Sequence, residues 1–160
     1  MRAPSVEEWG EILKADEYTE SRVDYCERKK KEGFEILAPE GGELQIDIDS
    51  MEAFKVFKAR MSRLVAEFGN FNVRIKESSS GFPHCHVIVD FDLIDVTVTP
   101  SERIALQAVL GSDPMREMLS MIRYLRGDPC PSLLAMKDAL NNWMTVGEWE
   151  ASNAKAKGGQ

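Results

Sequence analysis

The chain has 160 residues, 43% of them hydrophobic and 29% charged, a composition that can bury the core of one domain. The formal net charge of −7 argues against a general nucleic-acid-coating surface, but it allows a local basic groove. No apolar run approaches the roughly 20 residues that span a bilayer, no secretory signal is visible, and the three distant cysteines form neither a disulfide framework nor a zinc knuckle. We therefore expect a cytoplasmic protein with no membrane partner.

The first half of the chain predicts a helix followed by a β-α-β-β order. Helical sequence covers residues 5–32 and ends at Gly33, and a turn follows at 39–42. Strands are predicted over 43–49, 71–77 and 84–91, with a helix over 50–68. Because only the short turn 78–83 joins the last two strands, they should pair as a hairpin. The run Lys29–Lys31 is interpreted as the solvated end of the first helix rather than as a binding patch.

The second half of the chain is predicted to be helical. Helices are expected over 100–110 and 113–127, with Asp113 as the N-cap of the latter and Pro114 at its first helical position. A further helix is predicted over 133–144, and the small polar tail 151–160 should fray. No interdomain linker is visible, so we interpret residues 1–160 as a single α+β domain. Its parts are an N-terminal helical segment, a core, and a C-terminal helix with a tail, at 1–42, 43–126 and 127–160.

Two carboxylates end the first strand of this core. Apolar residues alternate with Asp47 and Asp49, so both side chains should project from one face, about 6 to 7 Å apart. Such a pair can bind one Mg²⁺, or ions bridged by nucleotide phosphates, and without a cation the two charges repel. The alternative is structural: Asp49 or Ser50 caps the following helix while Asp47 is solvated.

A serine turn precedes a pair of histidines. Ser80 and Gly81 belong to a turn whose hydroxyl and backbone groups can bind phosphate oxygens, although a plain flexible turn fits as well. His84 and His86 share a strand face, and Cys85 between them should point into the core. An imidazole leaving such a turn can contact a triphosphate or a metal, but a strand histidine is often purely structural.

Together these residues resemble motifs I and II of the archaeo-eukaryotic primase (primase-polymerase) superfamily, in its small viral and mobile-element type. Motif I corresponds to 46–49 and motif II to 80–89, and the run 103–116 is similar to the helical segment of these proteins. The resemblance covers about residues 43 to 126 and implies an RRM-like β-α-β-β catalytic core with flanking helices at both ends.

The resemblance also implies roles for individual residues. Asp47 and Asp49 would hold Mg²⁺ or Mn²⁺, and Ser80, Gly81 and His86 would engage the phosphates of a nucleotide triphosphate. The chain would then be a metal-dependent primase-polymerase-like nucleotidyltransferase, or a nucleotide- or nucleic-acid-binding protein, acting in DNA replication of a virus or plasmid. If it is viral, it would act in the host-cell cytoplasm. Its partners would be nucleotide triphosphates, a DNA or RNA template and replication proteins.

Basic residues beside these motifs are candidates for contacts with phosphate. Arg74 and Lys76 alternate on one face of the second strand, and Arg116 lies on a later helix. One departure from the family concerns its third motif, which supplies another metal-binding Asp. Ser120 occupies the expected region here, and Asp113 is better explained as a helix cap. This departure leaves two alternatives open: metal-dependent nucleotidyl transfer, or binding of nucleotide or nucleic acid without polymerisation.

Two other functions use the same residues. His84-Cys85-His86 fits the His-hydrophobic-His metal motif of rolling-circle replication and relaxase nucleases, in which a helical tyrosine attacks the DNA phosphate; Tyr124 is the candidate nucleophile. The lysine expected three residues after that tyrosine is absent, because Gly127 stands there. The third possibility is a catalytically inactive replication or interaction module.

Overall fold

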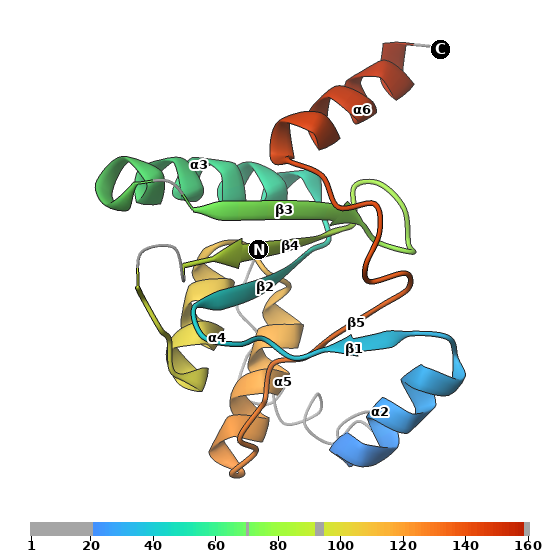
Figure 1. Ribbon diagram of the computed structural model, residues 1–160, viewed down its shortest axis with the longest axis vertical. Helices are drawn as coiled ribbons and strands as arrows, with labels where there is room; N and C mark the ends of the chain where they lie inside the picture. The colour runs from blue at the N-terminus through green and yellow to red at the C-terminus, as the bar shows by residue number, and fades with distance from the viewer. Residues whose placement is uncertain (1–20, 70, 92–94, 159–160) are drawn as a thin grey trace, which may run out of the picture.

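The protein has a mixed helix and strand architecture, which confirms the predicted α+β class. A computed structural model describes residues 21–69, 71–91 and 95–158 (Figure 1). The elements, in chain order, are α2 Arg22–Lys31, β1 Glu35–Leu37, β2 Glu43–Ile48, α3 Met51–Phe68, β3 Asn72–Glu77, β4 Cys85–Asp90, α4 Pro100–Val109, α5 Pro114–Leu125, β5 Leu134–Met136 and α6 Val146–Gly158. Among the described residues, no helix is both long and apolar enough to cross a membrane.

The main sheet has three strands in the order β2-β4-β3, and β4 is antiparallel to both neighbours. β2 and β3 therefore run parallel to each other, and α3 forms the crossover between them (Figure 1). The predicted β-α-β-β order and the β3–β4 hairpin are both confirmed. The register places Asp47 and Lys76 on either side of His86, so these three residues form one row across the sheet.

The apolar face of this sheet packs against α3. Strand alternation turns Ile46 and Val87 to this face, where both are fully buried. From α3, Phe54 and Phe57 fill the space above them. Cys85 is also fully buried in this cluster, which confirms the prediction that it is a core residue. With one face occupied by the core, the polar residues of β2, β3 and β4 are left together on the other face.

Side chains, rather than another strand, close the outer edge of β2. The Gln45 backbone N–H donates to Oε1 of Gln107 over 2.9 Å, and the Asp47 N–H donates to Oγ of Ser112 over 3.0 Å. Arg116 Nη1 donates to the Gln45 carbonyl over 2.7 Å. An open strand edge would expose unpaired backbone groups, so these bonds both satisfy the edge and fix α4 and α5 against it.

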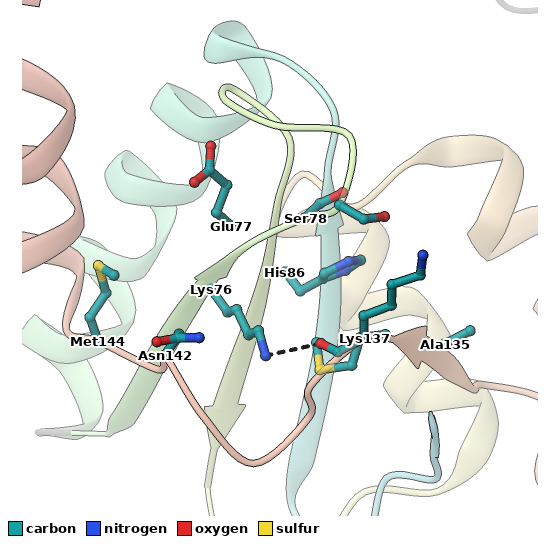
Figure 2. Close-up of a pocket in the computed structure, with 10 residues that line it drawn as sticks. Lys76, Glu77, Ser78, His86, Ala135, Lys137, Asn142 and Met144 are labelled. Atoms are coloured by element: carbon teal, nitrogen blue, oxygen red, sulfur yellow. Dashed lines mark hydrogen bonds between the residues drawn. The ribbon is translucent and has the colours of Figure 1, made fainter. Parts of the chain in front are cut away.

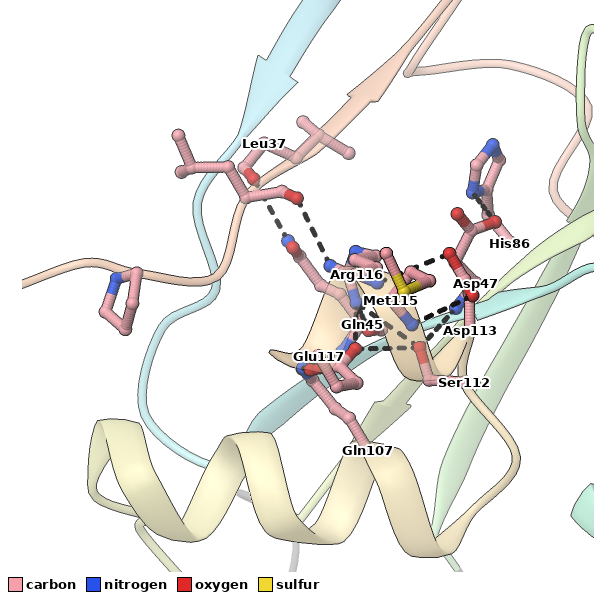
Figure 3. Close-up of polar contacts among 12 residues, drawn as sticks. Leu37, Gln45, Asp47, His86, Gln107, Ser112, Asp113, Met115, Arg116 and Glu117 are labelled. Atoms are coloured by element: carbon pink, nitrogen blue, oxygen red, sulfur yellow. Dashed lines mark hydrogen bonds and ion pairs between the residues drawn. The ribbon is translucent and has the colours of Figure 1, made fainter. Parts of the chain in front are cut away.

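One buried carboxylate holds the side chains of this edge in place. Glu117 is 3% exposed and accepts hydrogen bonds from Gln107 Nε2 at 2.9 Å and from Ser112 Oγ at 2.7 Å (Figure 3). It also accepts from Arg116 Nη1 at 2.5 Å. Because the charge is paired and its oxygens are satisfied, the network is stable in the interior, but loss of one member would leave the others unsatisfied.

The regions flanking the core differ from the predictions. A helix over 133–144 was wrong: β5 lies there and pairs antiparallel with β1, itself a strand inside the predicted helical segment 1–42. Burial alternates at Leu134 and Met136, as in a strand, and the positive φ angles of Asp138 and Asn142 are incompatible with a continuous helix. The C-terminal helix is α6, which continues through most of the tail that was expected to fray. The predicted helix over 5–20 lies outside the described residues.

Candidate functional site

The polar face of the sheet brings the predicted Asp and His residues together in two pairs. Nδ1 of His86 lies 3.4 Å from Oδ1 of Asp47, and Nδ1 of His84 lies 3.2 Å from Oδ1 of Asp49. The helix cap is provided by Ser50, whose hydroxyl accepts from the Ala53 N–H, so the Asp49 carboxylate is not used as the cap. The two strands therefore carry an Asp–His pair at the end of the sheet and a second one just beyond it.

Burial changes the acidity of Asp47. Loss of water around the carboxylate raises its pKa from 3.8 to about 6; the positive charge of Arg116 opposes this rise, and the negative charge of Asp49 adds to it. Because the side chain is 26% exposed, it can still be reached from solvent. A poorly hydrated carboxylate beside a second carboxylate gains from a nearby cation, because the cation favours the charged form of both groups.

His86 is neutral near pH 7. Burial, chiefly, and the positive charges of Arg116 and Lys76 together lower the pKa of its imidazole to about 4. Its Nδ1 is buried and has no hydrogen-bond partner in the described part of the chain, because the approach to Asp47 lacks hydrogen-bond geometry. A neutral imidazole has one donor and one acceptor nitrogen, so it can bind a ligand oxygen or a metal without carrying charge.

Two pockets border this face. The first, which we call the hairpin pocket, has a volume of about 400 Å³ and includes Lys76, Ser78, Ser79 and His86 (Figure 2). The second has a volume of about 380 Å³ and lies between α2 and α5; we call it the α2–α5 pocket. Its lining includes Asp47, His86, Asp113, Arg116, Ser120 and Arg123. His86 and Ala135 line both pockets, so the histidine stands where they adjoin.

The serine turn contributes to the hairpin pocket through different residues from those predicted. Ser78 and Ser79 line the pocket, and Figure 2 shows the Ser78 side chain on the same side of the hairpin as His86. Ser80 is exposed, and its N–H donates to Oγ of Ser78. Gly81 has a φ of +79°, a conformation that favours glycine and closes the turn. Contact of Ser80 and Gly81 with phosphate remains a prediction.

The basic candidates are already engaged with the protein. The Lys76 ammonium donates to the backbone carbonyls of Lys137 and Asp138, so it fastens the 137–142 loop over the sheet. Arg116 donates to backbone carbonyls and pairs with the buried Glu117. Arg74 lies 4.0 Å from the Glu43 carboxylate and above the Trp143 ring. Lys76 or Arg116 could contact a nucleotide only if these bonds broke. Arg74 is more exposed, so it could contact a ligand more readily.

The residues that distinguish the alternative functions lie around α5. Asp113 caps this helix by accepting from the N–H groups of Met115 and Arg116, in agreement with the prediction. Ser120 is buried and lines the α2–α5 pocket, as a third acid at this position would. Tyr124 is 38% exposed and is not among the residues that line either pocket. The structure therefore brings the histidines to the acids and leaves Tyr124 outside both pockets.

Sequence reasoning missed the contribution of α2 to this site. Tyr25 and Lys29 line the α2–α5 pocket together with Arg123. The lysine run at the end of α2 was the available signal, but its interpretation as a solvated helix end set it aside. The side chains of Gln107 and Glu117 position β2, but this role could not be predicted, because the local sequence does not show whether a polar residue is buried.

No three His, Cys, Asp or Glu side chains within the described ranges are grouped so that they could hold a metal ion. Two carboxylates are nevertheless compatible with Mg²⁺, which is usually bound by one or two carboxylates, with substrate phosphates and water completing its shell. No family model, curated protein or solved structure matches this chain.

Proposed function

We propose that this protein is a metal-dependent nucleotidyltransferase of the primase-polymerase type, which binds a nucleoside triphosphate on the polar face of the β2-β4-β3 sheet. The observation that carries the proposal is the register of β2 against β4. It sets Asp47 opposite His86, with the Asp49–His84 pair just beyond, at the junction of two pockets. The motifs that resemble those of the family thus lie on adjacent strands of one face.

The strand order supports an RRM-like core as the fold behind this function. A β-α-β unit with a third, antiparallel strand inserted between its two parallel strands is the split β-α-β arrangement. In this arrangement the helix covers one face, and the other face remains for ligands. Asp47, His86 and Lys76 lie on that second face, which supports the proposal of a ligand site there.

The charge of each residue determines the role that we assign to it. Asp47 and Asp49 would hold Mg²⁺ or Mn²⁺, and a bound ion would neutralise the triphosphate and polarise its phosphorus–oxygen bonds. Partial burial of Asp47 reduces the hydration of its carboxylate, which strengthens the attraction between this carboxylate and a cation. The neutral imidazole of His86 would donate a hydrogen bond to a phosphate oxygen, and the Ser78 and Ser79 hydroxyls in the hairpin pocket would add further donors.

A primer-extension and primer-synthesis assay with Mg²⁺ or Mn²⁺ tests this proposal. Wild type should extend, and the double variant Asp47→Ala/Asp49→Ala should lose extension. Glu67→Ala, an exposed acid removed from α3 on the far side of the sheet, is the matched control and should behave as wild type. Activity that survives in the double variant would contradict the site.

Binding should be measured separately from turnover, because Ser120 stands where the family has an acid. In a thermal-shift experiment with Mn²⁺ and a non-hydrolysable triphosphate, wild type and the Glu67→Ala control should gain stability. The double variant should gain none. Stabilisation without extension in wild type would limit the function to nucleotide binding, and stabilisation of the double variant would contradict nucleotide binding at these acids.

A further inference from the structure

A strip of positive charge and aromatic rings borders the two pockets on the side of α2. Its residues come from α2, from the segment before β1, from α5 and from the residue after β5. We call it the α2 strip, and its members are Arg22, Tyr25, Arg28, Lys29, Phe34, Arg123 and Lys137. These cations lie together although the formal net charge of the chain is −7.

The aromatic rings gather cations from separate elements. Above the Tyr25 ring, the guanidinium carbons of Arg28 and Arg123 lie 5.5 and 5.9 Å from the centroid. The ammonium groups of Lys29 and Lys137 lie 4.6 and 5.1 Å from the centroid of the Phe34 ring. Each ring therefore orients one cation of α2 and one cation of a distant segment, which pre-organises the charges along the strip.

Carboxylates compensate only part of this charge. Glu32 is shared by Arg28 and Lys29, at 3.1 and 3.2 Å. Asp128 pairs with Arg22 at 3.3 Å. In the part of the chain that the structure describes, neither Arg123 nor Lys137 forms an ion pair.

Arg123 forms no ion pair with the described residues, although the Asp128 carboxylate, which pairs with Arg22, lies near enough to act on its charge. It is half-buried, and burial, together with the nearby charge of Arg22, lowers the pKa of its guanidinium. Arg22 is already paired with Asp128 and donates to the backbone carbonyls of Cys130 and Pro131, so Arg123 is the guanidinium of this pocket wall that can take an anion.

The position of the strip relates it to the proposed active face. Arg22, Lys29 and Arg123 line the α2–α5 pocket, whose other wall carries Asp47 and His86. Lys137 lines the hairpin pocket beside His86. The cations therefore border both pockets, and they lie beside the Asp–His pairs rather than on the α3 side of the sheet.

We infer that the α2 strip binds the phosphate backbone of a single-stranded polynucleotide and guides it to the Asp47–His86 face; this inference rests on the proposed function. Cations contributed by three segments and spread over two pockets fit successive phosphates of a strand, whereas a mononucleotide would fill one pocket. A basic groove with interleaved aromatic side chains is typical of single-strand binding. The basic end of the α2–α5 pocket would take the strand, and the acidic end would take the incoming nucleotide with its cation.

The test is fluorescence anisotropy of the full chain with a labelled oligodeoxythymidylate in EDTA, which removes any contribution of metal at Asp47. Arg123→Gln should weaken binding about 10-fold and flatten the salt dependence by about 0.7 in log–log slope, the amount for one lost phosphate contact. Lys137→Gln should have a similar effect and is a second probe, since an exposed side chain is tolerant of substitution. Arg63→Gln, an exposed arginine on α3, is the matched control and should bind as wild type.

Two outcomes would overturn the inference. In the first, Arg123→Gln and Lys137→Gln bind the oligonucleotide with the same affinity and salt slope as Arg63→Gln. In the second, dATP displaces the oligonucleotide from wild type, and that competition disappears in Arg123→Gln, which would assign the strip to mononucleotides. Oligonucleotide binding that depends on the strip, without primer extension, would leave the inference intact and contradict only the proposed nucleotidyl transfer.

Discussion

Replacing Asp47 by Asn should stabilise the metal-free protein at neutral and alkaline pH, but not at acidic pH. The folded state raises the pKa of Asp47 from 3.8 to about 6, chiefly through burial. At about 1.36 kcal/mol per pKa unit, this shift means that the charged carboxylate costs the fold about 3 kcal/mol. The cost is fully present above pH 6, decreases as the folded protein takes up a proton, and is absent below pH 3.8. Asparagine has no charge to desolvate, so it removes this cost.

Urea unfolding in EDTA at pH 8 and at pH 4 measures this effect. At pH 8, Asp47→Asn should gain about 2–3 kcal/mol, or about 1 M in the urea midpoint, and at pH 4 it should gain little. The exposed substitution Glu67→Gln is the control and should change neither value. With Mn²⁺ in place of EDTA, wild type should be more stable than Asp47→Asn, because the ion binds and stabilises the folded protein only where the Asp47 carboxylate is present. A loss of stability at pH 8, or an equal gain at both pH values, would refute the reasoning.

Four other substitutions examine the surroundings of the site. Glu117→Leu should cost about 3–5 kcal/mol in urea unfolding, because the Arg116 guanidinium loses its buried carboxylate; a cost below about 1 kcal/mol would contradict the network. Lys76→Met should cost about 1–3 kcal/mol and speed proteolysis within residues 137–142, and unchanged cleavage would show that Lys76 does not fasten this loop. Ser120→Asp should lower the melting temperature in EDTA and gain more from Mn²⁺ than wild type does, and an equal gain would place Ser120 away from the ion. Tyr124→Phe should leave primer extension unchanged, whereas a covalent DNA adduct that disappears in this variant would establish the tyrosine nuclease instead.

Local patterns in the sequence identified the central elements correctly. The alternation in β2 and β3 and the helical period of α3 reflect which face each residue turns to the core, and this signal can be read from neighbouring residues. The caps at Ser50 and Asp113 were readable for the same reason, because a cap bonds to backbone groups only two or three residues away. The pairing of β3 with β4 followed from the short turn.

Interactions between distant segments were not readable in this way. The segment 133–144 could be mistaken for a helix because its strand β5 is stabilised by β1, almost 100 residues earlier. Lys76 and Arg116 looked like free phosphate-binding cations, but the backbone carbonyls that hold them belong to segments far away in the chain. The cations of α2 were set aside because their aromatic and arginine neighbours on other elements are not sequence neighbours.

The sequence by itself therefore determined the β-α-β-β order and which acids and histidines could share a face. Only the tertiary structure decided that β4 lies between β2 and β3, which sets Asp47 opposite His86. It also decided the ionisation of both groups: burial raises the pKa of Asp47 to about 6 against the opposing charge of Arg116, whereas burial and Arg116 together lower the pKa of His86 to about 4. Periodicity records the direction of a side chain relative to its own element, whereas strand neighbours, desolvation and charge partners depend on how separate elements pack together.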